Sequence, residues 1–136
     1  MTAGYSGTPL AKKLGIVPGI VLAMIDDPGH FLHLAAPLPD GVIVRETARG
    51  KADVAVLFTR NEARLRARIG SLGRMIFPDG ALWVSWPKRA SGVPTDLTED
   101  GVRDVALPLG MVDVKVAAID ETWSGLKLVW RRERRR

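Results

Sequence analysis

The stretch that decides the fold is ADVAVLFTRNEARLRARIGSLGRMIFPDGALWVSW, residues 52–86. It opens with the apolar run 52–59 and closes with the apolar run 81–86, and both runs predict strands that are buried on two faces. Residues 61–76 predict a helix between the strands, because their apolar side chains recur at helical spacing and form one stripe. These side chains are Leu65, Ile69, Leu72 and Ile76. A strand, a helix and a second strand in this order indicate a parallel pair joined by a crossover helix.

The rest of the chain adds strands on both sides of this unit. The apolar run 20–25 and a second predicted strand, 41–47, precede it, and the alternating patterns of 111–120 and 125–132 follow it as a predicted hairpin. Shorter helices are expected from Thr8 to Gly15, from Asp27 to Pro37, and from Asp96 or Thr98 to Gly110. We therefore predict an α/β fold: a three-layer sandwich around a six-stranded, mostly parallel sheet that ends in an antiparallel hairpin.

One connection between predicted strands is short for a parallel sheet. The strands 41–47 and 52–59 are separated only by about the segment ARGKA, which extends to roughly 17 Å. A parallel crossover normally needs a dozen or more residues. Either the earlier strand ends near Val44, which lengthens the connection, or the two strands form an antiparallel hairpin. We favour the first alternative.

Length and composition limit the class of protein. A chain of 136 residues fits one domain with a core of its own, and we predict a Rossmann-like domain over 1–130 followed by a basic tail, 131–136. The chain has no cysteine, which excludes disulfides and thiolate metal sites. No apolar run reaches the roughly 20 residues of a membrane span. We expect a cytoplasmic protein without a membrane partner.

The positive charge is concentrated at one end of the sequence. The formal net charge is +5, and the last six residues, RRERRR, carry five arginines and one glutamate, which leaves +1 for residues 1–130. Such a segment could bind nucleic acid through its phosphates without sequence preference. The alternative is a solvated, frayed terminus.

Part of the chain resembles a known fold family. The segments ADVAVLF, FPDGALWVSWPK and VDVKVAAIDETWSGLKLVWRR, within residues 52–130, resemble the C-terminal half of class I methyltransferase-like domains. The whole chain, through GYSGTPLAKKLGI, WPKRASGVPTDLTE and DETWSGLKLV, is similar to an uncharacterised bacterial family of domains of unknown function, the 3052 family. Together the resemblances imply a truncated methyltransferase-like, Rossmann-like fold and no known reaction.

The methyltransferase resemblance implies a cofactor, S-adenosylmethionine, that is held on a glycine-rich turn after the first strand. Here the run 20–25 continues instead into Asp26, Asp27, Pro28 and Gly29, without a G-x-G pattern. Glu46 follows Asp26 at about the offset of a ribose-binding acid in nucleotide-binding folds. We predict no resident cofactor; S-adenosylmethionine is the one that the resemblance leaves open.

Ligands of open α/β sheets bind beyond the carboxyl ends of the parallel strands. Four chain exits would meet at this edge: 26–27, 59–61, 86–96 and 120–124. The candidate ligand-binding residues are Asp26, Asp27, Glu46, Asn61, Trp86, Lys88, Arg89, Ser91, Thr95, Asp96, Glu121 and Trp123. No catalytic residue can be named from this set.

Several of these side chains also have a purely structural explanation. Alternation along the strand puts Trp83 on the opposite face from Trp86, so Trp83 is expected in the core, while Trp86 and Trp123 would form an aromatic wall of the site. Lys88 and Arg89 could be ordinary solvent-facing charges, and the prolines of their loop could only stiffen it.

We assign no function to two further groups of charged or titratable side chains. Arg60, Arg64 and Arg68 form a basic stripe, which is typical of a solvated helix face. His30 and His33 share a predicted helix face, but an i, i+3 pair of histidines is too common to predict a metal site, and none is predicted.

Three classes of function follow. The first is a non-catalytic or degenerate methyltransferase-like domain that acts by binding a ligand or a protein, because the predicted rim has no recognisable catalytic set. The second is a small S-adenosylmethionine-dependent methyltransferase or a nucleotide binder. The third is a nucleic-acid accessory protein that uses the arginine-rich tail. The oligomeric state is left open.

Overall fold

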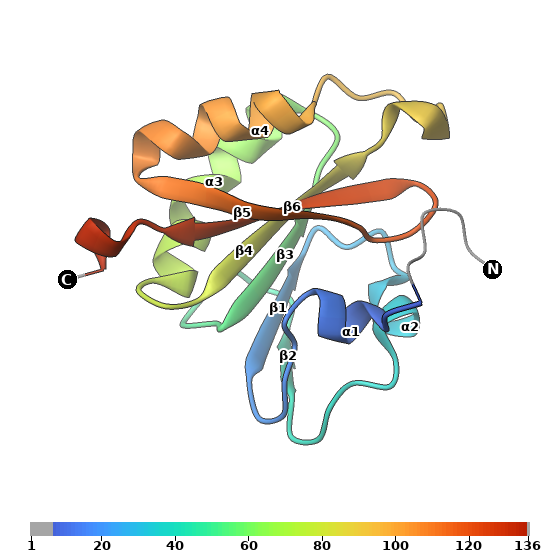
Figure 1. The fold of residues 1–136 in the computed structure, drawn as a ribbon, viewed down its shortest axis with the longest axis vertical. Helices are drawn as coiled ribbons and strands as arrows, with labels where there is room; N and C mark the ends of the chain where they lie inside the picture. The colour runs from blue at the N-terminus through green and yellow to red at the C-terminus, as the bar shows by residue number, and fades with distance from the viewer. Residues whose placement is uncertain (1–6, 136) are drawn as a thin grey trace.

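The computed structural model describes residues 7–135 and contains one six-stranded sheet with helices on both faces (Figure 1). The strands are β1 (Val21–Ile25), β2 (Ile43–Arg45), β3 (Val54–Phe58), β4 (Ala81–Pro87), β5 (Met111–Ala118) and β6 (Trp123–Trp130). Their order in the sheet is β2-β1-β3-β4-β6-β5, with the first four parallel and the last two antiparallel to their neighbours. The predicted α/β class and mostly parallel sheet are confirmed.

Four α-helices and three short 3₁₀ turns accompany these strands within the described residues. They are α1 (Leu10–Lys13), α2 (Phe31–Ala35), α3 (Glu62–Ile76), η1 (Arg89–Ser91), α4 (Glu99–Ala106), η2 (Leu107–Leu109) and η3 (Arg132–Arg134). Figure 1 shows α3 and α4 on one side of the sheet and α1 and α2 on the other, which gives the three predicted layers. No helix in residues 7–135 is long and apolar enough to cross a membrane.

The sheet separates two apolar clusters. One contains Leu65 and Leu72 of α3 together with Trp86, and the other contains Phe31 of α2 together with Trp83. The two tryptophans therefore lie on opposite faces of β4, as the alternation predicts. Trp83 is fully buried, and its indole N–H donates to the backbone carbonyl of Leu14 at 3.1 Å.

The connection between β2 and β3 can be short because the two strands are not joined by a helix and only β1 lies between them in the sheet. Strand β2 ends at Arg45, one residue beyond Val44, and it pairs in parallel with β1 on the side away from β3. Residues 46–53 extend to about 26 Å, enough to return along a three-residue strand and cross β1 without a helix. The alternative that we favoured is confirmed, and the hairpin alternative is wrong.

This strand order creates a topological switch point between β1 and β3. The connection from β1 to β2 carries α2 on one face of the sheet, whereas the connection from β3 to β4 carries α3 on the opposite face. Chain segments therefore diverge beyond the carboxyl ends of β1 and β3. In open α/β sheets a cleft at such a point is the common ligand site.

The start of one helix agrees with the position predicted from the sequence, and the start of another does not. The start of α3 is capped by Asn61, whose Oδ1 accepts from the amide of Arg64 at 2.8 Å, within the predicted helix 61–76. The helix predicted to begin at Asp27 begins instead at Phe31. Gly29 has a φ of +109°, which no helix accommodates, so the first turn cannot form where the Asp-Pro pair suggests it.

The glycines of the strand-connecting turn and of α3 allow a direct test of the packing. A methyl group on Gly80 would lie 2.7 Å from the carbonyl oxygen of Ile76 and 2.9 Å from that of Asp53, whereas one on Gly70 would meet only the flexible guanidinium of Arg74 at 3.7 Å. Gly80→Ala should therefore destabilise the protein by about 2 kcal/mol or more. Gly70→Ala, the matched control, should stabilise it by up to about 1 kcal/mol through helix propensity. Urea unfolding followed by circular dichroism measures both; equal shifts in one direction would contradict this packing.

Candidate functional site

A cleft lies at the switch point, where the chain exits predicted from the sequence come together. Its volume is about 510 Å³, within the usual range for small-molecule sites. All four exits contribute to its walls: the end of β1, the end of β3, the loop after β4 and the turn between β5 and β6. The residues that line this switch-point cleft are Asp26, Pro28, Phe58, Thr59, Arg60, Asn61, Arg64, Val93, Thr122 and Trp123.

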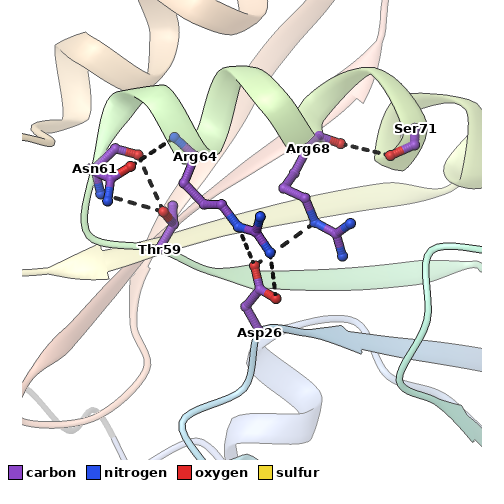
Figure 2. Close-up of polar contacts among 6 residues, drawn as sticks. All are labelled: Asp26, Thr59, Asn61, Arg64, Arg68 and Ser71. Carbon is purple, nitrogen blue, oxygen red and sulfur yellow. Dashed lines mark hydrogen bonds and ion pairs between the residues drawn. The ribbon is translucent and has the colours of Figure 1, made fainter.

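Asp26 is held in a fixed position at the floor of the cleft. Its φ of +57° lies in the left-handed region, which a non-glycine residue adopts only at a cost. The Arg64 guanidinium binds it with two hydrogen bonds, Nε to Oδ2 at 3.0 Å and Nη2 to Oδ1 at 3.2 Å (Figure 2). The hydrogen bond and the charge of Asp26 both raise the pKa of Arg64. Asp26 is therefore already paired with a cation.

A second arginine approaches the same carboxylate. Arg68 reaches from the next turn of α3, and its Nε lies 3.9 Å from Oδ2 of Asp26 (Figure 2). This Nε is buried and has no hydrogen-bond partner among the described residues. The interpretation of Arg60, Arg64 and Arg68 as one solvated face is therefore wrong for Arg68, whose Nε is buried, whereas Arg64 stays exposed while it pairs with Asp26 at the end of β1. Their spacing of four residues was the signal in the sequence, but it did not reveal this partner.

The start of α3 and the loop after β4 form one connected wall. Asp96 accepts from the amide of Glu62 at 2.8 Å, and the Thr95 hydroxyl donates to the carbonyl of Arg60 at 2.6 Å. Asp96 thus satisfies a free amide in the first turn of α3, whereas α4 is capped by Thr98. Of the predicted rim residues, Asn61, Thr95 and Asp96 all serve to hold this wall in place.

The opposite wall is built around Asp120 in the turn between β5 and β6. Its Oδ1 accepts from the amides of Thr122 at 2.8 Å and Trp123 at 2.7 Å, and its Oδ2 lies 2.9 Å from Nε2 of His30. Burial by itself would raise the pKa of Asp120, but these hydrogen bonds outweigh it and lower the pKa. The pair of His30 and Asp120 was missed in the sequence, because the two residues are distant in the chain and only the sheet brings them together.

The turn also places an aromatic surface on the cleft. The Trp123 ring packs edge-on against Phe58, with ring centroids 5.1 Å apart and an interplanar angle of 88°. Both side chains line the cleft. Trp123 is half-buried, which makes it available to a ligand on one side.

Trp86 does not belong to this wall, which corrects the prediction of an aromatic pair. In the sheet Trp86 is opposite Ser124, and Trp123 is opposite Pro87, so the two tryptophan side chains point to different faces. Trp86 packs in the cluster under α3 and lines a separate groove of about 700 Å³ with Lys88 and Arg89. The long loop thus borders two sites rather than one.

The remaining predicted residues lie outside the switch-point cleft. Asp27 accepts from the amide of Gly29 at 2.9 Å within its own turn, and the Ser91 hydroxyl donates to the carbonyl of Lys88 at 2.7 Å. Glu46 and Glu121 are exposed and do not line the cleft. Within residues 7–135, no group of three or more His, Asp or Glu side chains is arranged to hold a metal ion.

Comparison with known proteins identifies the fold. No family model matches the sequence, and no curated protein matches it either. Solved structures that are similar include a putative type 11 methyltransferase from Sulfolobus solfataricus (TM-score 0.62, 11% identity, 90% of this chain and 89% of that one). A SAM-dependent methyltransferase from Aquifex aeolicus is also similar (TM-score 0.60, 12% identity, 88% and 86%). A third is magnesium protoporphyrin IX methyltransferase from Synechocystis with bound SAM (TM-score 0.56, 13% identity, 90% and 74%).

These likenesses show a methyltransferase-like Rossmann fold. At such low sequence identity, structural similarity shows the fold of this chain and not its activity. The similarity to the domain-of-unknown-function family stays a prediction, since no family model matches.

The Asp120 contacts predict a pH-dependent contribution to stability. Because the folded-state pKa of Asp120 is lowered, its stabilisation is present above the usual aspartate value of 3.8 and is lost as the pH falls through the lower folded value. Asp120→Asn should destabilise the protein by about 1–2 kcal/mol at pH 7. The difference from the wild type should shrink below about pH 4.

Urea unfolding at pH 7 and at pH 3 measures this effect. Asp104→Asn, at an exposed position of α4, is the matched control and should change stability little at either pH. A deficit of Asp120→Asn that is the same at both pH values would show that the charge of Asp120 is not what stabilises the turn.

Proposed function

We propose that this protein is a methyltransferase-like domain that acts by binding a small organic anion in the switch-point cleft. The observation that carries the proposal is the bidentate pair of Asp26 and Arg64 at the floor of the cleft. Because this carboxylate is already neutralised, it neither repels an anion nor serves as a free base for proton transfer.

The charges that line the cleft favour an anion. They are the carboxylate of Asp26 and the guanidinium groups of Arg60 and Arg64, which leaves an excess of one positive charge. Arg68 adds a further cation behind Asp26. The Arg60 side chain is exposed and makes no ion pair within residues 7–135. An exposed guanidinium group without an ion-pair partner is suited to bidentate binding of a carboxylate or phosphate.

The apolar lining favours a ligand with a flat ring. Phe58 and Trp123 meet edge to face, and Val93 and Pro28 complete the apolar surface. A planar group could pack on the half-buried Trp123 while its anionic group reaches Arg60. This combination of one ring and one anionic group fits the volume of about 510 Å³.

A second candidate is a small S-adenosylmethionine-dependent methyltransferase. The observation that favours it is the likeness to a Synechocystis methyltransferase structure with bound SAM. S-adenosylmethionine carries a cationic sulfonium, which the arginines of the cleft would oppose, and it is normally held by a glycine-rich turn that Asp26 and Asp27 replace here. The cleft therefore favours the anion-binding proposal.

Isothermal titration calorimetry separates the two candidates. The probes are phenyl phosphate, its neutral analogue phenol, S-adenosylmethionine and S-adenosylhomocysteine. We expect phenyl phosphate to bind more tightly than phenol and than S-adenosylmethionine, because only the first brings a dianion to Arg60 and Arg64.

Two variants should change the affinity in opposite directions. Asp26→Asn keeps a residue that tolerates the left-handed backbone and frees the Arg64 guanidinium from its carboxylate partner, so it should strengthen phenyl phosphate binding roughly fivefold. Arg60→Gln should weaken it by a similar factor. Arg66→Gln, which removes a charge of α3 that is paired with Glu62 and does not line the cleft, is the control and should leave the affinity unchanged. Weaker binding of phenyl phosphate to Asp26→Asn, or tight S-adenosylmethionine binding that Asp26→Asn abolishes, would overturn the proposal.

A further inference from the structure

A row of cations and aromatic rings lies at the end of the sheet opposite the switch-point cleft. Lys51 donates to the backbone carbonyls of Phe77 at 3.1 Å and Arg74 at 3.4 Å, and its Nζ is 5.8 Å from the centroid of the Phe77 ring. Phe77 in turn packs edge-on against Trp130, with centroids 5.8 Å apart. Both rings are half-buried.

The arginines that follow Trp130 are folded against this row. The amide of Arg131 donates to the carbonyl of Gly110 at 3.0 Å, and residues 132–134 form the 3₁₀ turn η3, which Figure 1 shows beyond the end of β6. The Arg135 Nε donates to the carbonyl of Trp130 at 2.8 Å. The Arg134 side chain lies across Gly110, where a methyl group would meet it at 3.1 Å. Residues 131–135 are therefore not a frayed terminus.

The surface formed by Lys51, Arg74, Phe77, Trp130 and residues 131–135 is here named the arginine platform. Within the described part of the chain, none of its arginines makes an ion pair with a carboxylate, and Glu133 is the one acid in the turn. Residues 131–134 are exposed. The platform therefore presents unneutralised guanidinium groups on a backbone that is already ordered.

We infer that the arginine platform binds single-stranded nucleic acid. Guanidinium groups recognise phosphates through two parallel hydrogen bonds, and half-buried aromatic rings between cations offer stacking surfaces for unpaired bases. The turn η3 has three residues, too few to enter the groove of a duplex. A membrane surface fits less well, because the indole N–H of Trp130 donates inward to the carbonyl of Gly73 at 2.9 Å and the ring is not free to insert.

Fluorescence anisotropy with a labelled 20-nucleotide oligo-dT, titrated at several salt concentrations, tests this inference. The triple variant Arg74→Gln, Arg131→Gln and Arg132→Gln removes three exposed charges of the platform. It should weaken binding at least tenfold at low salt and reduce the slope of log affinity against log salt by about 2, since each phosphate contact contributes about 0.7. The control removes three charges elsewhere, with Lys12→Gln, Arg66→Gln and Lys115→Gln, and should keep most of the affinity and slope.

A second variant tests the aromatic part of the platform. Phe77→Leu keeps an apolar side chain and removes the ring, so it should weaken oligo-dT binding by about fivefold or more with the salt slope unchanged. Thermal unfolding of every variant, followed by circular dichroism, verifies that the protein is folded under the binding conditions.

Three results would overturn the inference: equal losses in the platform variant and the control, binding to a duplex of the same length as tight as to oligo-dT, or binding only to phosphatidylserine vesicles. This test does not involve the switch-point cleft, so its outcome is independent of the proposed function.

Discussion

The central position of β1 is the constraint on which the rest of the structure depends. This strand pairs in parallel with β2 on one side and β3 on the other, and its residues Leu22 to Ile25 are almost completely buried. Because the segment 46–53 returns the chain across β1, the crossovers β1→β2 and β3→β4 run in opposite directions, and their helices α2 and α3 cover opposite faces. The switch point, and with it the cleft, follows from this crossing rather than from any single side chain.

The electrostatics of the cleft follow from one contact between layers. Asp26 leaves β1 in a left-handed conformation that directs it toward α3, where Arg64 binds it with two hydrogen bonds. A free carboxylate at this position would favour a cationic ligand, whereas the paired carboxylate leaves the arginines to determine the sign of the charge. If the proposed function holds, this methyltransferase-like architecture presents a cleft with the opposite preference from one that holds a sulfonium cofactor.

Strand β6 links the two surfaces to which we assign binding. Trp123 at its start lines the switch-point cleft, and Trp130 at its end anchors the arginine platform through the carbonyl of Gly73. The length of β6 separates the two tryptophans, and its antiparallel direction relative to β4 places Trp123 beside the last residue of β4 and Trp130 at the other end of the sheet. The two surfaces can therefore be altered independently.

The sequence by itself determined the elements whose signal is local. The apolar stripe of residues 61–76 and the alternation that separates Trp83 from Trp86 needed no tertiary information, because helix and strand periodicity act between near neighbours. The convergence of four chain exits also followed, since parallel strands end at a common edge. Only the tertiary structure decided the pairings of Asp26 with Arg64, His30 with Asp120, and Arg134 with Gly110. These contacts join residues far apart in the chain, and their geometry depends on sheet order and register, which no local pattern encodes.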